Sequence, residues 1–307
     1  MRRIVSATPD TLTRRREQCL RGLRTWALLA VAAGLGGCAW LSAKQSELAL
    51  RPTPGRPAAF ASDTVGLRPG DLRFTVPVAR AGAPPQQLAL WWLPHADPQA
   101  PTLLYLHGTF RNLYQNLSKI EALRDAGFAI VAVDYRGWGD STSIVPTEAT
   151  INADVRLAWA ELQRRQPVPG RRVIFGHSMG GAVAVTLASS LRHGSDYGAL
   201  ALESTFTRMP DVAAEAGFWG RVAGALTTLE FNSLAKIKRV DAPIFMLHGD
   251  ADRTVPIALG RRLRDAAPPG ARWVEVPGGS HSQLHSQSPG IYRSAFADLK
   301  KALAPTP

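Results

Sequence analysis

A serine flanked by glycines carries the strongest chemical signal in the sequence. Ser178 lies in the pentapeptide Gly176-His177-Ser178-Met179-Gly180, between an apolar run at 172–175 and small residues at 182–188. A serine at so sharp a strand-to-helix turn has strained backbone angles, and its neighbours two positions away must be tiny to avoid collision. The turn projects the hydroxyl out of the sheet and leaves the amide of Met179, at the start of the new helix, free to stabilise an oxyanion. The pentapeptide therefore predicts the nucleophile of an acyl-transfer reaction.

A serine hydroxyl needs a base to activate it, and the base needs an orienting acid. His281 follows the last predicted strand, and Asp250 and Asp252 follow the strand before it. Loops at the carboxyl ends of strands are where catalytic groups gather in sheets of this kind. The order Ser178, Asp252, His281 is the nucleophile–acid–base order expected with such a turn. His285 is the competing base, and Asp250 is the competing acid.

The elements that must position these residues alternate along the chain from Thr102 onward. Strands are predicted at 103–106, 129–133, 173–175, 200–202, 244–247 and 273–276. Helices are predicted at 114–124, 151–165, 181–191, 257–266 and 292–303. Continuous apolar strands between amphipathic helices indicate a parallel sheet covered on both faces. Runs at 72–78 and 88–93, separated by Ala81-Gly82-Ala83-Pro84-Pro85, predict a hairpin that adds an antiparallel edge.

One insertion interrupts this alternation. About 40 residues separate the strand ending near Glu203 from the strand at Ile244, which is more than a single crossover helix needs. The segment 206–238 carries Phe218, Trp219 and other apolar residues at spacings typical of short amphipathic helices. We predict a small lid over the active-site end of the sheet.

From about Leu72 to the C-terminus, the chain resembles an α/β hydrolase of the serine-aminopeptidase-like and monoacylglycerol-lipase-like branch. The resemblance rests on five motifs in the expected order: His107-Gly108, Asp134-Tyr135-Arg136-Gly137-Trp138-Gly139-Asp140-Ser141, the serine pentapeptide, His248-Gly249-x-x-Asp252-x-x-Val255-Pro256 and Gly279-x-His281. It implies an α/β-hydrolase fold, with a mostly parallel central sheet, helices on both faces and a small lid insertion.

The resemblance also assigns roles to residues. The family places the acid three residues after the glycine of the His-Gly pair, which is Asp252. It places a second oxyanion amide just after His107-Gly108, at Thr109, with Phe110 as the alternative donor. The implied activity is cleavage of ester bonds, including lipid esters or thioesters, through an acyl-enzyme at Ser178. The alternatives are a serine peptidase or aminopeptidase-like amidase and a non-catalytic, lipid-anchored binding protein.

The N-terminus predicts export. A basic stretch precedes an apolar run from Trp26 to Leu35, which is too short to span a bilayer comfortably. Leu35-Gly36-Gly37-Cys38 resembles a bacterial lipoprotein cleavage box, in which Cys38 becomes the lipidated first residue. The residue after Cys38 is Ala39, and no aspartate retention signal is present, so the resemblance implies the outer membrane, facing the periplasm, rather than the inner membrane. We therefore expect a signal peptide at 1–38, a Pro- and Gly-rich tether at 39–70 and a hydrolase domain at 71–307.

Composition excludes several other classes. The 307 residues carry a formal charge of +12, which falls to +7 for a chain that begins at Cys38. The basic residues are scattered without an aromatic-interleaved stripe, so nucleic-acid binding is not expected. The two cysteines, Cys19 and Cys38, lie in or at the end of the predicted signal, so the domain has no disulfide. No metal or organic cofactor is implied, because the sequence lacks a thiolate cluster, a His-Glu-x-x-His helix and a phosphate-cradling loop.

Overall fold

The computed structural model describes residues 37, 40–60, 66–79, 82 and 84–303. The chain divides into two units, Met1–Gln45 and Ser46–Pro307, of which the second contains the predicted hydrolase domain. Cys38 and the predicted signal segment before Gly37 lie outside the described residues. Among the helices that the structure describes, none is both long enough and apolar enough to cross a bilayer.

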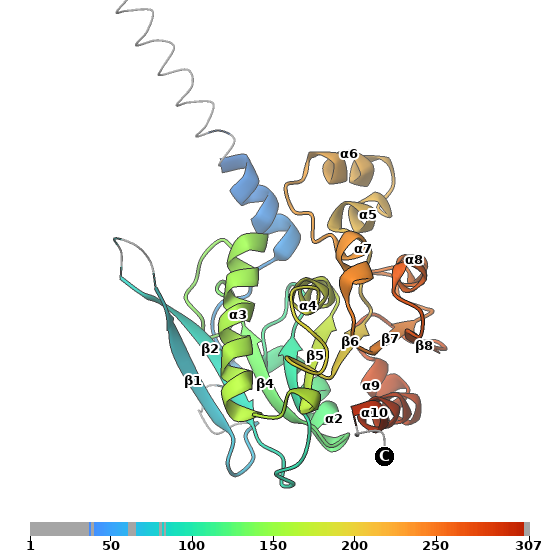
Figure 1. Cartoon of the computed structure of the whole chain (residues 1–307). Coiled ribbons are helices and arrows are strands. Elements are labelled where there is room, and N and C mark those ends of the chain that lie inside the picture. The colour runs from blue at the N-terminus through green and yellow to red at the C-terminus, as the bar shows by residue number, and fades with distance from the viewer. Residues whose placement is uncertain (1–36, 38–39, 61–65, 80–81, 83, 304–307) are drawn as a thin grey trace, which may run out of the picture. The chain divides into compact units, whose positions relative to one another are not determined.

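An eight-stranded sheet forms the centre of the larger unit (Figure 1). Its strands are β1 (Leu72–Val78), β2 (Gln86–Leu93), β3 (Thr102–Leu106), β4 (Ala129–Asp134), β5 (Arg172–His177), β6 (Ala199–Glu203), β7 (Ile244–Gly249) and β8 (Arg272–Val276). Their order across the sheet is β1-β2-β4-β3-β5-β6-β7-β8. β2 pairs antiparallel with both β1 and β4, and all other pairs are parallel. The predicted parallel sheet and antiparallel edge are therefore confirmed.

Helices cover both faces of the sheet, as the continuous apolar strands predict. The α-helices are α2 (Leu117–Asp125), α3 (Glu148–Arg165), α4 (Met179–Ala188), α5 (Met209–Ala214), α6 (Phe218–Leu226), α7 (Ser233–Lys236), α8 (Ile257–Ala266), α9 (Leu284–Gln287) and α10 (Pro289–Leu303). Helices α3, α4 and α8 pack on one core, and α2, α9 and α10 pack on the other. Alternate side chains of a strand enter opposite cores: Leu104 lies in the first core and Tyr105 in the second.

The predicted tether at 39–70 is wrong for much of its length. Residues 40–50 are helical, and residues from Ser46 onward belong to the compact unit. Leu50 is fully buried, and the amide of Gly139 donates to the carbonyl of Thr53 at 2.9 Å. The physical reason is that helix breakers begin only at Pro52, while the residues before it are mostly good helix formers. The Pro-rich stretch after it is irregular but is held by the domain.

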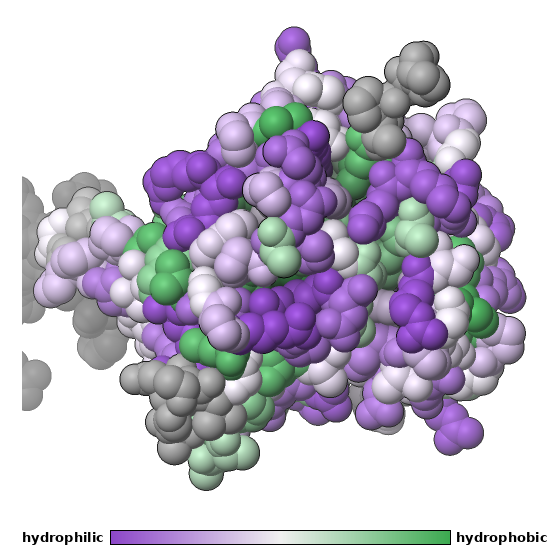
Figure 2. All heavy atoms as spheres, turned by 90° about the horizontal axis from the view of Figure 1, so that it is seen from below, coloured by the Kyte–Doolittle hydropathy of each residue, from purple (hydrophilic) through white to green (hydrophobic). Residues whose placement is uncertain are grey.

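The segment between β6 and β7 forms short helices, as predicted. Helix α6 packs its glycines against α5: a Cβ on Gly220 would lie 2.0 Å from the carbonyl oxygen of Ala213. Its opposite side carries the exposed residues Phe218, Trp219, Val222 and Leu226. These four positions fall within about 100° of the helix circumference, so they form one apolar stripe. By contrast, the face shown in Figure 2 is mostly polar, with apolar side chains only in small separate areas.

Candidate active site

Ser178 lies at a strained turn between β5 and α4. Its φ is 56°, which is in the left-handed region that few residues other than glycine adopt. A Cβ on Gly176 would lie 2.2 Å from the carbonyl oxygen of Gly180, and a Cβ on Gly180 would lie 2.1 Å from that of Leu106. Both flanking positions therefore require glycine, because any side chain there would collide with the backbone, as the sequence predicts.

His281 and Asp252 meet Ser178 from two other loops. His281 Nε2 lies 3.0 Å from Ser178 Oγ, and His281 Nδ1 lies 2.7 Å from Asp252 Oδ2. All three residues are buried. The loops after β5, β7 and β8 reach the same edge of the sheet because these strands run parallel. An imidazole held in this way has one nitrogen aimed at the hydroxyl and the other fixed by a carboxylate.

The competing acid and base lie elsewhere. Asp250 is exposed, and its Oδ1 accepts a hydrogen bond from the amide of Gly278 at 2.7 Å, so Asp250 braces the loop that carries His281. His285 Nε2 lies 3.2 Å from Ser118 Oγ instead of Ser178. The geometry therefore favours Asp252 and His281 over these alternatives.

The environment of Asp252 keeps its carboxylate ionised. Burial acts to raise the pKa of Asp252, but hydrogen bonds from His248, His281 and the Val255 amide outweigh it, so the pKa falls well below its ordinary value of 3.8. His248 Nε2 lies 2.9 Å from the Val255 carbonyl and 3.4 Å from Asp252 Oδ2, so the carbonyl is its closer acceptor. Oδ1 of Asp252 accepts from the amides of Thr254 and Val255, both at 2.9 Å. These contacts fix the carboxylate in orientation as well as in charge.

Two backbone amides are candidates for the oxyanion hole. Met179 is the first residue of α4, so its amide has no acceptor within the helix. The loop after β3 lies against the serine, since a Cβ on Gly108 would come within 3.1 Å of Ser178 Cβ. In that loop the Phe110 amide donates to the Leu50 carbonyl at 3.3 Å, whereas no hydrogen bond within the described residues engages the Thr109 amide. Thr109 is therefore the better placed second donor.

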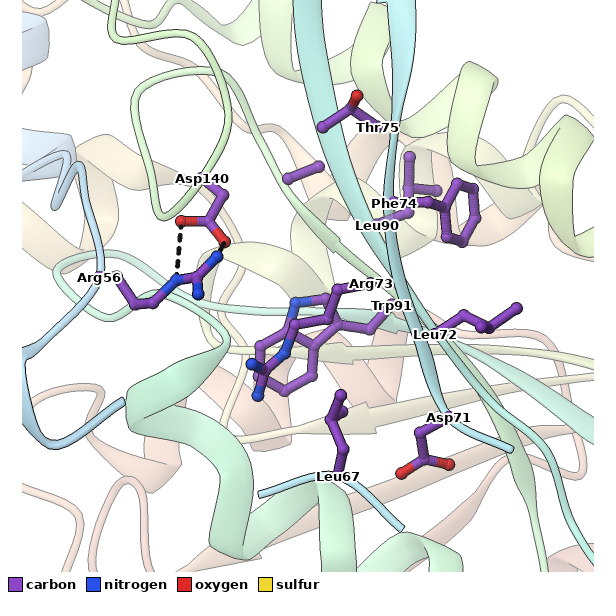
Figure 3. A pocket seen from close by; sticks show the side chains of 11 residues that line it. Arg56, Leu67, Asp71, Leu72, Arg73, Phe74, Thr75, Leu90, Trp91 and Asp140 are labelled. Carbon is purple, nitrogen blue, oxygen red and sulfur yellow. Dashed lines mark hydrogen bonds and ion pairs between the residues drawn. The ribbon is translucent and has the colours of Figure 1, made fainter. Parts of the chain in front are cut away.

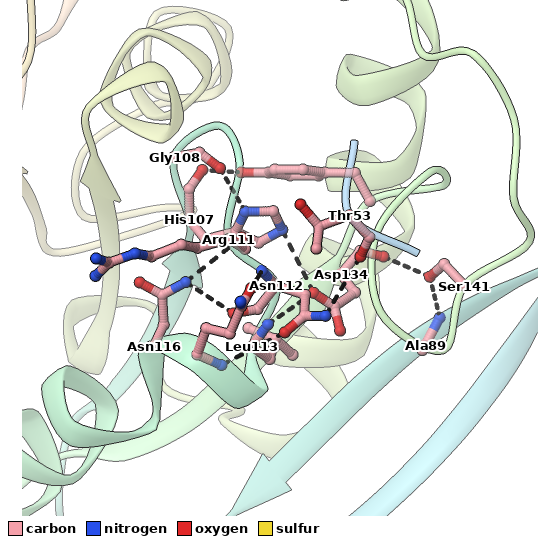
Figure 4. A network of polar contacts seen from close by, with 12 residues as sticks. Thr53, Ala89, His107, Gly108, Arg111, Asn112, Leu113, Asn116, Asp134 and Ser141 are labelled. Atoms are coloured by element: carbon pink, nitrogen blue, oxygen red, sulfur yellow. Dashed lines mark hydrogen bonds and ion pairs between the residues drawn. The ribbon is translucent and has the colours of Figure 1, made fainter. Parts of the chain in front are cut away.

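A buried polar network fixes this loop (Figure 4). Asn112 Nδ2 donates to the carbonyls of Gly55 at 2.9 Å and Thr53 at 3.3 Å, and Asn116 Nδ2 donates to the carbonyl of Asn112 at 2.8 Å. The Leu113 amide donates to Asp134 Oδ1 at 2.9 Å. Sequence reasoning missed Asn112, because its partners lie in the segment that was predicted to be a tether. It also missed Asn116, whose partner is the Asn112 carbonyl in the same loop.

His107 and Asp134 lie together at the base of the network. Their closest approach is 3.5 Å, between Nε2 and Oδ1, and both side chains are fully buried. Burial lowers the pKa of His107 to about 4 and raises the pKa of Asp134 to about 8. His107 is thus a neutral structural residue, packed against Tyr135 and Trp138 with ring centroids 4.4 and 5.7 Å away.

A second buried pair lies near the serine turn and was not predicted. The Lys119 ammonium contacts the Glu203 carboxylate, which also accepts from the Tyr292 hydroxyl at 3.1 Å. Lys119 is 2% exposed and Glu203 is fully buried. Glu203 could be noticed in the sequence only as a charge at the end of an apolar strand, and nothing local identified Lys119 as its partner.

The pocket beside Ser178 is narrow. It has a cavity volume of about 10 Å³, which is space for about one water molecule. Its lining comes from residues 108–111, 116, 177–178 and 281–282. No residue of 206–238 lines it, so the covering role predicted for the lid segment stays a prediction.

A larger cavity, of about 430 Å³, lies against β1 and β2 (Figure 3). Arg73 lies over the Trp91 ring at 4.5 Å there, and Arg56 pairs with Asp140 at 2.8 Å. None of Ser178, Asp252 and His281 lines this cavity. Its size therefore does not make it the candidate hydrolytic site.

A mostly parallel sheet with a strained serine turn after β5 and a histidine loop after the last strand defines the class of α/β hydrolases. Solved structures agree at the level of fold. The esterase Pf2001 of Pyrococcus furiosus matches with a TM-score of 0.63 at 16% identity, over 82% of this chain and 98% of that one. Est1E of Butyrivibrio proteoclasticus, with ferulic acid bound, matches with a TM-score of 0.57 at 17% identity, over 74% of this chain and 98% of that one.

Sequence comparisons narrow the family. The family model described as serine aminopeptidase, S33, matches residues 97–232. An uncharacterized protein of Mycobacterium tuberculosis is 33% identical over 64% of this chain and 68% of its own length. Protein ABHD12B of Homo sapiens is 30% identical over 63% of this chain and 57% of its own length. The lysophosphatidylserine lipase ABHD12 of Danio rerio is 30% identical over 58% of this chain and 50% of its own length. The matched region thus spans little more than half of the ABHD12 relatives. The chain belongs to the S33 serine-aminopeptidase-like family of α/β hydrolases.

Proposed function

We propose that this protein is a serine hydrolase that cleaves esters through an acyl-enzyme at Ser178. The observation that carries the proposal is the continuous contact from Ser178 Oγ through His281 to Asp252, at 3.0 and 2.7 Å. His281 Nε2 takes the hydroxyl proton as Oγ attacks the acyl carbonyl, and it then gives that proton to the departing alcohol. Water, deprotonated by the same nitrogen, releases the acid and regenerates the serine.

Two amides and one carboxylate stabilise the charges that form. The amides of Met179 and Thr109 donate to the oxyanion of each tetrahedral intermediate. Asp252, held ionised by its hydrogen bonds, fixes the tautomer of His281 and stabilises the imidazolium. A non-catalytic binding protein would have no need for this alignment.

A lipophilic acyl group is the proposed substrate feature. The apolar stripe on α6 exposes Phe218 by 62% and Trp219 by 78%, which is a large apolar area to leave in water. Three relatives are named as lysophosphatidylserine lipases, and the fold is shared with esterases. We therefore propose a lipid ester, handled by a carboxylesterase or lysophospholipase-type reaction.

Aminopeptidase activity, which the family description names, is the second candidate. An aminopeptidase must hold an α-ammonium group close to the scissile bond, and a carboxylate is the natural partner for it. The residues that line the pocket at Ser178 include Arg111 and no carboxylate. The positive charge of Arg111 favours esters over peptides with free amino termini.

The proposed location is the cell envelope, with Cys38 lipidated and the hydrolase domain facing the periplasm from the outer membrane. The support is the cleavage-box pattern at Leu35-Gly36-Gly37-Cys38. Palmitate labelling of cells that express the full chain tests it. The label should be lost in Cys38→Ser, and labelling that survives this change would refute the anchor.

A fluorophosphonate probe tests the chemistry. Wild type and Ser190→Ala, a control serine two residues beyond the C-terminal end of α4, should label, while folded Ser178→Ala should not. p-Nitrophenyl esters of graded chain length are then compared with aminoacyl anilides. Folded wild type that never labels would reject the enzyme, and a preference for anilides over every ester would reverse the order of the two candidates.

A further inference from the structure

A second pocket adjoins the one at Ser178. It has a cavity volume of about 150 Å³ and lies between the loop after β3, helix α2 and the segment after His281. Arg111, Asn116 and Ser282 line both pockets, so the two are contiguous. A group bound in the second pocket therefore lies beside a carbonyl bound at Ser178.

The second pocket has an unusual lining. All nine lining residues carry polar or basic side chains, and none carries a carboxylate. The ammonium of Lys119 is occupied by Glu203, which leaves Arg111 as the available charge among them. Within the described residues, the Arg111 guanidinium makes no hydrogen bond or ion pair, and it lies 5.9 Å from the centroid of the Phe110 ring. In Figure 4 it extends away from the network that fixes its loop.

His285 adds an independent observation. Its Nε2 contacts Ser118 Oγ, while its Nδ1 is buried and has no hydrogen-bond partner in the described part of the chain. A buried ring nitrogen without a partner is costly. The pocket thus offers a half-buried guanidinium, the ring of His285 and several hydroxyl and amide groups.

We propose that this pocket binds an anionic group, a phosphate or carboxylate, carried by the alcohol side of the ester. The proposal rests on the proposed ester hydrolysis and specifies its substrate class as esters with a negatively charged head group. A guanidinium in a pocket without carboxylates favours anions and repels cations. The neutral polar side chains around it suit the remaining oxygens of a phosphate, which accepts several hydrogen bonds.

The test compares two lipids with the same acyl chain, lysophosphatidylserine and the uncharged monoacylglycerol, using the full chain. Wild type should have a kcat/KM at least about tenfold higher for lysophosphatidylserine. Arg111→Gln should lower the ratio of the two kcat/KM values at least about tenfold, mainly through KM, and Arg111→Lys should restore part of it. Arg156→Gln, at an exposed position on α3, is the matched control and should keep the wild-type ratio.

Salt and inorganic phosphate give further readouts. Wild-type kcat/KM for lysophosphatidylserine should fall with ionic strength more steeply than that of Arg111→Gln. Equal kcat/KM for both lipids in wild type would overturn the proposal, as would equal losses on both lipids in Arg111→Gln. Competition by inorganic phosphate without a preference for the charged lipid would mean that the pocket binds a free anion, which also overturns it. Probe labelling of Ser178 in the same preparation separates these results from a failure of the proposed function.

Discussion

The backbone amide of Ser178 donates to the backbone carbonyl of Glu203 at 2.9 Å, so the serine turn is attached to the strand end that carries a buried carboxylate. That carboxylate is paired with Lys119 on α2 and with Tyr292 on α10. Glu203 thus connects the serine turn to the helices on one face of the sheet. The same arrangement makes the domain sensitive to loss of the lysine.

Lys119→Met should destabilise the domain by about 3–5 kcal/mol, because it leaves the Glu203 carboxylate buried without its counter-charge. Adding Glu203→Gln should recover part of that loss, since the amide carries no charge. Urea unfolding of the single and double variants measures this, with Lys301→Met on the exposed side of α10 as the control, expected within about 0.5 kcal/mol of wild type. A single variant as stable as wild type would show that the pair contributes nothing.

Asp252→Asn should reduce kcat at least roughly a hundredfold, because the amide neither fixes the required tautomer of His281 nor stabilises its charged form. Asp250→Asn is the matched control. Its remaining Oδ1 can still accept from the Gly278 amide, so kcat should change by less than about threefold. Steady-state kinetics on one p-nitrophenyl ester decide between the two acids, and the reverse pattern would make Asp250 the acid.

Asn112→Ala should lower kcat roughly ten- to a hundredfold with a smaller change in KM. The substitution removes the hydrogen bonds to Thr53 and Gly55 that fix the loop bearing the Thr109 amide, and one lost oxyanion donor costs about a hundredfold or more in kcat. Asn152→Ala on α3 removes a bond to the Glu148 carbonyl and should leave kcat close to wild type. If Asn112→Ala changed KM alone, the loop would contribute to binding and not to the oxyanion hole.

The stability of the domain should fall as pH rises from about 6.5 to 8. Burial raises the pKa of Asp134 from 3.8 to about 8, so the folded state holds a proton there that the unfolded state has already lost, and stability decreases through this window. His107 opposes this only at lower pH: its pKa falls from 6.5 to about 4, so its contribution to stability rises with pH between these values and is constant above them.

Asp134→Asn isolates that effect. The amide keeps an oxygen to accept from the Leu113 amide but does not titrate. The variant should lose less stability than wild type between pH 6.5 and 8, by up to about 1.4 kcal/mol per pH unit. Urea unfolding at the two pH values gives the difference, and equal pH dependence in both proteins would contradict a protonated Asp134.

Much of this protein could be predicted from its sequence, because the signals are local. The predicted bounds of the strands agree with the observed bounds within two residues. Fully buried strands are continuous apolar runs, and the helices between them have a different period. The turn at Ser178 is equally local: Gly176 and Gly180 are required by backbone collisions within a few residues and with the adjacent strand. The chain order of Ser178, Asp252 and His281 then follows from the alternation of elements.

The tertiary structure decided which of several similar residues meet. His281 and His285 are four positions apart, and only the packing of their loop directs one ring to Ser178 and the other to Ser118. The Phe110 amide is engaged by Leu50, 60 positions earlier, and Lys119 meets Glu203 across 84 positions. Contacts of this kind leave no periodicity in a single sequence, because they are created when distant segments fold against one another.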